Sequence, residues 1–132
     1  MDISVIKGYR SGLENKLKEQ LNESKKKYGY ESEKISYIQP EKNRTYTPDF
    51  ILNKKDGEKM YIETKGRWVL EDRQKHELIR KQYPSLDIRF IFSNPNAKIN
   101  KKSKTTYADI CNKFGWKFAK KTIPQEWLDE CI

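Results

Sequence analysis

Apolar residues in the first part of the chain recur with helical spacing. Between residues 11 and 28, three leucines follow one another at four-residue intervals among Glu, Lys and Gln side chains; they are Leu13, Leu17 and Leu21. Leucines at this spacing share one side of a helix, so the segment predicts an amphipathic helix with a single apolar stripe, which Gly29 ends. Residues 30–37 favour a strand, and the polar stretch around Pro40 follows as a connector.

Two apolar runs in the middle of the chain predict a β-hairpin. Residues 50–52 and 60–62 are apolar, and the polar residues between them include an Asp-Gly pair, Asp56 and Gly57. An Asp-Gly pair between two apolar runs is a strong hairpin pattern. In a hairpin centred on Asp56, residues at equal distances before and after Asp56 face each other. Asp49 and Glu63, each seven residues from Asp56, therefore form such a pair.

The C-terminal half alternates between helical and strand patterns. We expect a helix over residues 70–83, a strand over 86–92, a Lys-rich loop over 93–104, a helix over about 106–114, a strand over 116–119 and a helical turn after Pro124. This order indicates the α/β class, with a mixed sheet in a single domain over residues 1–132. The tryptophans and cysteines are expected to be packing residues: Trp68, Trp116, Trp127, Cys111 and Cys131.

The chain is strongly basic. It carries 28 Lys and Arg against 19 Asp and Glu, a formal net charge of +9, which favours nucleic acid as a partner but also suits plain solubility. No apolar run is long enough for a membrane span, so we expect a cytoplasmic protein with no membrane partner. The side chains expected to contact DNA, each equally explained as solvated surface, are Arg10, Arg67, Arg73, Lys75, His76, Arg80, Lys98, Lys101, Lys102 and Lys104.

The predicted hairpin brings two carboxylates and an amine together. Directly opposed side chains have Cβ atoms about 4.5–5.5 Å apart, and like charges placed so are destabilising unless something positive lies between them. Side chains alternate along a strand, so Lys65 shares a face with Glu63. Because Mg²⁺ prefers hard oxygen ligands, Asp49, Glu63 and Lys65 predict metal-dependent phosphodiester cleavage. The alternative is a turn-type acid after Pro48 and an ordinary solvated strand face.

Other chemistries have little support in the sequence. His76 is the only histidine, which excludes zinc motifs that need two. No glycine-rich phosphate loop is present, so no nucleotide cofactor is expected. Ser11 and Glu14 match the Ser-x-x-Glu capping box of a helix start, in which Glu14 has a purely structural role.

Five motifs, in order over nearly the whole chain, resemble the phage endonuclease I family of Holliday-junction resolvases. They are Arg10-Ser11-Gly12-Leu13-Glu14, Thr45-Tyr46-Thr47-Pro48-Asp49-Phe50, Glu63-Thr64-Lys65-Gly66, Leu86-Asp87-Ile88-Arg89 and Ile123-Pro124-Gln125-Glu126-Trp127. The resemblance implies a restriction-endonuclease-like core and a Mg²⁺-dependent enzyme, with Mn²⁺ as a substitute. Its substrates would be four-way junctions and other branched DNA, cut by paired nicks. The implied catalytic residues are Glu14, Asp49, Glu63 and Lys65, and the three acids would bind the metal.

The same resemblance implies a homodimer that exchanges segments. Residues 1–34 of one chain would complete the site in the catalytic core, residues 45–132, of the other chain, across a bridge over residues 35–44. A dimer suits DNA with two scissile strands, because each site meets one strand. A phage-encoded protein of this kind would work in the host cytoplasm. The other functions left open are a sequence-specific duplex endonuclease and a DNA-binding module without catalysis.

Overall fold

A computed structural model describes residues 8–39 and 42–132, with side chains for residues 12–39 and 43–132. Its helices and strands, in chain order, are α2 (Gly8–Ser24), β1 (Tyr28–Tyr30), β2 (Ile35–Gln39), β3 (Lys42–Tyr46), β4 (Phe50–Asn53), β5 (Lys59–Lys65), α3 (Leu70–Gln82), β6 (Asp87–Phe92), α4 (Tyr107–Phe114), β7 (Lys117–Lys120) and α5 (Gln125–Asp129). None of the described helices is long and apolar enough to span a bilayer.

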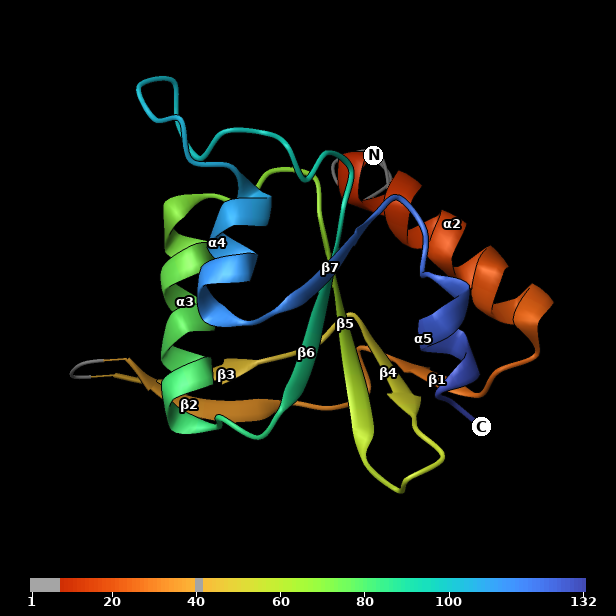
Figure 1. The fold of residues 1–132 in the computed structure, drawn as a ribbon. Coiled ribbons are helices and arrows are strands. Elements are labelled where there is room, and N and C mark those ends of the chain that lie inside the picture. The colour runs from red at the N-terminus through yellow and green to blue at the C-terminus, as the bar shows by residue number, and fades with distance from the viewer. Residues whose placement is uncertain (1–7, 40–41) are drawn as a thin grey trace.

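The predicted mixed sheet is confirmed. Its five strands lie in the order β1-β4-β5-β6-β7, in which β1, β4 and β5 pair antiparallel and β5, β6 and β7 pair parallel. Helices α2 and α5 cover one face of this sheet and α3 and α4 the other (Figure 1). The result is a three-layer α/β arrangement, in which each helix buries its apolar side against the sheet.

Each face of the sheet has its own hydrophobic core. Along β5, Met60 and Ile62 point to the α2 and α5 side, whereas Tyr61 points to the α3 and α4 side, as strand alternation requires. The leucine stripe of α2 is buried in the first core. The tryptophans and cysteines expected to be packing residues are all buried: Trp68, Trp116, Trp127, Cys111 and Cys131.

The predicted hairpin and its register are confirmed. Phe50 pairs with Ile62, and Leu52 pairs with Met60. Gly57 in the turn has a φ of 91°, a left-handed conformation that glycine adopts without the strain of a Cβ atom. This register carries the chain just before β4 to a point opposite the last residues of β5.

The first helix has different limits from those expected. It begins at Gly8 and ends at Ser24, because Lys25 takes a left-handed conformation with a φ of 57°. Gly29 therefore does not end the helix but lies in β1, where a Cβ atom would collide with the side chain of Ser32. Ser11 lies inside the helix rather than at its cap, so the capping-box explanation for Glu14 is wrong.

Residues 35–46 form a separate two-stranded hairpin. The strand expected over 30–37 is interrupted, because Glu31 has a φ of 48° and β2 begins only at Ile35. Strands β2 and β3 pair from Ile35↔Tyr46 to Gln39↔Lys42. The side chain of Gln82 on α3 accepts from the amide of Ile38 over 2.7 Å and donates to its carbonyl over 2.5 Å. In a single chain, the expected bridge is thus a hairpin docked against α3.

A buried arginine joins two of the motifs found in the sequence. Arg89 donates two hydrogen bonds to Asp87, both over 2.8 Å, and two to Glu130, over 2.6 and 3.0 Å. Its guanidinium also lies 5.2 Å from the ring centre of Trp127. These contacts fasten the C-terminal helix α5 to the sheet, so the motifs around Arg89 and Trp127 have a structural explanation.

Candidate active site

Asp49 lies directly before β4, and Glu63 lies near the end of β5. The amide of Asp49 donates to Oε1 of Glu63 over 3.2 Å. In return, Oδ2 of Asp49 accepts hydrogen bonds from the amide and the hydroxyl of Thr64, over 2.9 and 3.0 Å. Hydrogen bonds from side chains thus continue the β4–β5 pairing beyond its last backbone pair, Phe50 and Ile62. Both carboxylates are buried and fixed in place.

Lys65 joins this pair from the same strand. Its Nζ lies 3.5 Å from Oε2 of Glu63 and 3.4 Å from Oδ2 of Asp72, in the first turn of α3. The side chain of Lys65 is only 10% exposed. The structure therefore brings together three of the four residues expected to be catalytic.

Burial of the site changes the protonation of Glu63. Removal from water raises the pKa of Glu63 to about 7, and the adjacent carboxylate of Asp49 adds to the rise, whereas Lys65 opposes it. Two acids in such proximity resist being ionised together. A divalent cation between them would remove that repulsion, because it favours the ionised form of both.

The donor atoms fit a magnesium ion. Asp49 and Glu63 offer hard carboxylate oxygens, and Mg²⁺ binds through one or two carboxylates while keeping water and phosphate oxygens as its other ligands. Within residues 8–39 and 42–132, no three His, Cys, Asp or Glu side chains form a metal-binding group. The described site is therefore a pair of carboxylates, and it lacks the four ligands of a closed structural metal centre.

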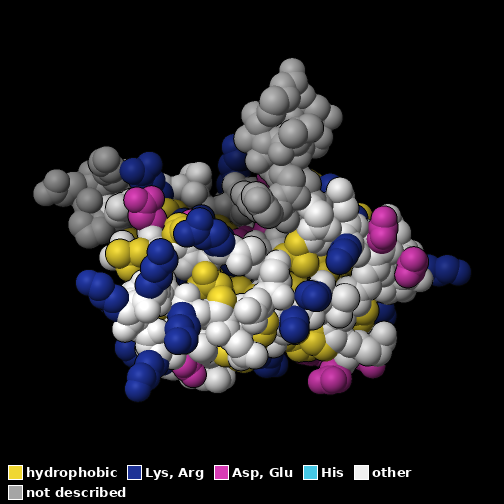
Figure 2. Space-filling model, turned by 90° about the horizontal axis from the view of Figure 1, so that it is seen from above, with side chains coloured by type: hydrophobic (Ala, Val, Ile, Leu, Met, Phe, Trp, Pro, Cys, Tyr) yellow, Lys and Arg dark blue, Asp and Glu magenta, His cyan; other side chains and the backbone are white. Residues whose placement is uncertain are grey.

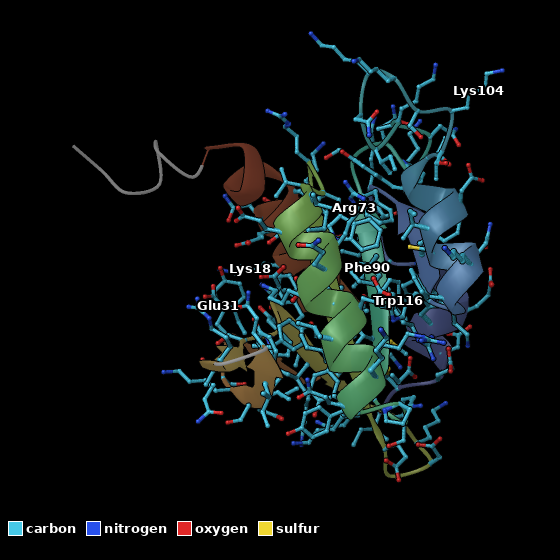
Figure 3. The ribbon with its side chains drawn as sticks, turned by 90° about the vertical axis from the view of Figure 1, so that its left-hand side faces the viewer. Lys18, Glu31, Arg73, Phe90, Lys104 and Trp116 are labelled. Atoms are coloured by element: carbon cyan, nitrogen blue, oxygen red, sulfur yellow. The ribbon has the colours of Figure 1, made fainter. Side chains whose placement is uncertain are left out.

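Glu14 lies beside this group rather than within it. Its carboxylate is buried on α2 and accepts a hydrogen bond from Tyr30 over 2.5 Å. Tyr30 pairs with Phe50, the residue after Asp49, so Glu14 approaches the same edge from the other layer of the fold. One turn further along α2, Lys18 lies over the ring of Tyr30, with its Nζ 3.6 Å from the ring centre. Figure 3 shows Lys18 near Glu31, at the side of the sheet away from α4.

Comparison with known proteins identifies the family. A family model described as phage endonuclease I matches residues 1–132. The chain is 48% identical over 128 residues to "Endonuclease I" of Escherichia phage T7, which covers 97% of this chain and 83% of that protein. It is 47% identical over 124 residues to "Endodeoxyribonuclease 1" of Enterobacteria phage T3, covering 94% and 79%. This chain belongs to the phage endonuclease I family.

In this member of the phage endonuclease I family, exposed lysines and arginines lie on the segment after β5 and on the loop before α4. The expected DNA contacts that are exposed are Arg67, Lys98, Lys101, Lys102 and Lys104. Figure 2 views the molecule from above, and dark blue Lys and Arg side chains are spread over this face. Lys104 lies on the loop that projects past α3 and α4 (Figure 3). A hollow of about 300 Å³ separates Arg67 from this loop.

Other residues expected to contact DNA have structural partners. Nε of Arg73 donates to the carbonyl of Trp68 and Nε of Arg80 to that of Phe114, both over 3.1 Å. Lys75 lies 5.7 Å from the ring centre of Tyr46 and lines a hollow of about 570 Å³ between α3 and the β2–β3 hairpin. The side chain of Arg10 lies outside the described residues. Arg73, Arg80 and Lys75 therefore hold α3 in place as well as adding positive charge.

His76 is buried, whereas a residue that contacts DNA was expected to be exposed. It is 0% exposed, because it lies on the side of α3 that faces the sheet, three residues before the buried Ile79. Burial, together with Lys65 and Lys75, lowers the pKa of His76 well below its ordinary value, so its ring is neutral. The three-residue spacing from Ile79 was the sequence pattern that pointed to burial.

Two residues of the site, Thr64 and Tyr46, were not expected from the sequence, whereas Asp72, close after the site, was expected to orient a Lys or Arg. Thr64 fixes Asp49, Asp72 contacts Lys65, and Tyr46 lies buried near Glu63, whose carboxylate adds to the effect of burial in raising the pKa of Tyr46 well above its ordinary value. Thr64 lies between the two predicted catalytic residues and Tyr46 within the motif that ends in Asp49. In the sequence, the proximity of Thr64 and Tyr46 to the predicted catalytic residues was the only sign that they belong to the site.

Proposed function

We propose that this protein is a Mg²⁺-dependent endodeoxyribonuclease that resolves four-way junctions and other branched DNA by paired nicks, with Mn²⁺ as a substitute for Mg²⁺. The observation that carries the proposal is the pair of opposed, buried carboxylates of Asp49 and Glu63, with the ammonium of Lys65 3.5 Å from Glu63. Membership in the phage endonuclease I family supports the same reaction. The basic face around the site suits a polyanionic substrate.

Each residue of the site has a separate proposed role in phosphodiester cleavage. A divalent cation, when bound, supplies an activated water and neutralises charge that develops on the phosphate. Asp49 and Glu63 would hold it, and Thr64 keeps Asp49 oriented through two hydrogen bonds. Glu14, at the same edge, is proposed as a third carboxylate of the working site. Lys65, between Glu63 and Asp72, is placed to orient the attacking water or stabilise the phosphate.

The proposed enzyme is a homodimer that exchanges its N-terminal segment. In the β2–β3 hairpin, the register is symmetric about the connection between Gln39 and Lys42. Two extended chains, each running straight through this region, can therefore form the same backbone pairs with one another that one chain forms by folding back. Exchange consequently costs none of these pairs, and it gives the assembly two sites for two scissile strands.

The sequence of the connection favours the exchanged form. Only Pro40 and Glu41 separate the paired residues Gln39 and Lys42. Two-residue hairpin connections prefer type I′ or II′ turns, which need a positive φ at the first central position. Proline locks φ near −65°, so this chemistry opposes both turns. An extended chain through Pro40 avoids the conflict while keeping the pairing.

Cleavage of a four-way junction and of its linear arms tests the proposal. With Mg²⁺ or Mn²⁺ we expect paired nicks in the junction and little cutting of the arms, and chelation of the metal should stop the reaction. Asp49→Asn and Glu63→Gln should bind the junction without cutting it. Glu58→Gln, an exposed acid at the far hairpin turn, is the matched control. Preference for linear duplex would indicate a duplex endonuclease, and binding without cleavage by the wild type a DNA-binding module.

A further inference from the structure

Polar atoms without partners gather behind the proposed metal site. Among the described residues, the buried side-chain atoms that lack a hydrogen-bond partner are Tyr46 Oη, Trp68 Nε1 and both ring nitrogens of His76. His76 is 0% and Tyr46 1% exposed, so water does not reach either side chain from the surface. Buried polar groups are usually paired, because each unpaired one lowers the stability of the fold. Such a cluster calls for an explanation.

His76 and Tyr46 both lie next to Glu63. Nε2 of His76 is 3.9 Å from Oε2 of Glu63, less than 1 Å beyond the usual length of a hydrogen bond. The rings of Tyr46 and His76 meet edge to face, with centres 5.2 Å apart. A neutral imidazole carries one donor nitrogen, and a phenol carries a donor hydroxyl. Two donors thus stand behind one carboxylate: Tyr46 is close enough to affect the pKa of Glu63, but neither donor makes a hydrogen bond of good geometry.

We propose that His76 and Tyr46 are positioning residues for Glu63, which donate hydrogen bonds to its carboxylate when it binds the divalent cation. This inference rests on the proposed function. A carboxylate that binds a metal keeps lone pairs that need donors in a pocket without water, and such donors set its orientation and its affinity. A small rotation of the Glu63 side chain would close the 3.9 Å gap to His76, and the hydroxyl of Tyr46 already lies close enough to help lower the pKa of Glu63. Lys65 approaches the same carboxylate along β5, and its ammonium is shared with Asp72.

The surroundings of His76 distinguish this role from packing. Its ring contacts Phe90 edge to face at 4.9 Å and lies 6.4 Å from the rings of Trp68 and Trp116. Phe90 and Trp116 are labelled beside α3 in Figure 3. A phenylalanine would suit this aromatic cluster and would leave no nitrogen unpaired. The histidine therefore lowers stability, which is expected where a buried polar group serves a function.

His76→Phe and Tyr46→Phe test the proposal, with Trp116→Phe as the control that disturbs the same aromatic cluster without removing either donor. Three quantities are measured: thermal unfolding without metal, Mn²⁺ affinity without DNA by calorimetry, and the Mn²⁺ concentration that half-activates cleavage. We expect His76→Phe to keep or raise the melting temperature, while Mn²⁺ affinity falls about 10–100-fold and half-activation shifts in parallel. Trp116→Phe should lower the melting temperature and leave Mn²⁺ affinity unchanged.

Wild-type Mn²⁺ affinity and half-activation in folded His76→Phe would overturn the role of His76, whatever its melting temperature. Tyr46→Phe removes a single oxygen, so its Mn²⁺ affinity can be measured even if His76→Phe does not fold. Wild-type Mn²⁺ affinity in Tyr46→Phe would overturn the proposed role of Tyr46 toward Glu63. Failure of the proposed function itself is separate. In that case, the wild-type protein would neither bind Mn²⁺ nor depend on it for cleavage.

Discussion

Thr64 holds the carboxylate of Asp49 through both its amide and its hydroxyl, over 2.9 and 3.0 Å. Backbone pairing of the hairpin stops one step earlier, at Phe50 and Ile62. The carboxylate of Asp49 therefore accepts a hydrogen bond from the amide of Thr64, two residues beyond the last paired residue of β5. This contact places one acid of the site by the same register that builds the sheet, so the geometry of the site and the stability of the hairpin are coupled.

Thr64→Val should separate the hydroxyl from the amide. Valine keeps the shape and the strand propensity of threonine but removes one of the two hydrogen bonds to Asp49. We expect unfolding free energy to fall by about 1–3 kcal/mol, because a buried carboxylate loses a partner. Cleavage should fall on the order of tenfold, because a misplaced catalytic group loses rate. Denaturant unfolding and single-turnover cleavage measure the two effects. Thr64→Ser, which keeps the hydroxyl, should stay near wild type in cleavage; equal losses in both variants would contradict the argument.

Asp72→Asn should impair the chemical step more than DNA binding. The carboxylate of Asp72 lies 3.4 Å from Nζ of Lys65, so its loss of charge frees the ammonium from one of its two partners. We expect the single-turnover rate to fall on the order of tenfold, with junction affinity within about twofold of wild type. Glu71→Gln is the matched control, because Glu71 is an exposed acid in the same first turn of α3. Equal effects of both variants would assign the loss to the helix dipole instead.

The raised pKa of Glu63 predicts that metal-free stability falls with rising pH. Its pKa moves from 4.5 to about 7 in the folded protein, chiefly through burial. The folded state then holds a proton that the unfolded state releases, so the contribution is complete below pH 4.5 and is lost as the pH rises through about 7. The loss is up to about 3 kcal/mol. Denaturant unfolding in chelator between pH 5 and pH 8 measures it. Glu63→Gln should remove this slope, and an unchanged slope in that variant would assign it to other groups.

Lys101→Ala and Lys102→Ala should weaken DNA binding without preference for a particular sequence. Both lysines are exposed on the loop next to the site, where they suit contacts with phosphates. Each loss should reduce the slope of log affinity against log salt by about 1, because fewer counterions are released on binding. Binding of a junction to the Asp49→Asn background at several salt concentrations measures the slope. Lys55→Ala, at the opposite hairpin turn, should leave it unchanged; an equal effect there would indicate a general charge effect only.

The sequence predicted the hairpin because all the necessary information is local. Asp56 and Gly57 define the turn, alternation defines the faces, and together they bring Asp49 opposite Glu63. Lys65 follows from the same alternation. The core of the candidate site could be predicted because its three residues belong to one supersecondary unit, in which neighbours in space are fixed by counting along the chain.

Contacts between elements could not be predicted in this way. His76 resembled a surface residue in a basic helix, and its burial depends on how α3 packs on the sheet. The contact between Asp72 and Lys65 depends on that same packing, although the position of Asp72 soon after the site already suggested that it orients a Lys or Arg. The end of α2 and the break before β2 were also missed, because Lys25 and Glu31 take left-handed conformations that their residue types rarely adopt. In each case tertiary structure overrides the local pattern.

Mixing inactive subunits should reveal the exchange of segments. In an exchanged dimer, the core of a Glu14→Ala subunit receives an intact helix from an Asp49→Asn subunit, so each mixed dimer has one complete site. Random mixing should then restore about a quarter of wild-type nicking, with single rather than paired nicks. Without exchange, each site lacks one acid and no activity returns. As the matched structural control, Pro40→Asn with Glu41→Gly supplies an Asn-Gly turn that suits the closed hairpin. Sedimentation should show this variant shifted toward monomer, and an unchanged dimer would mean that Pro40 does not determine the choice between the two forms.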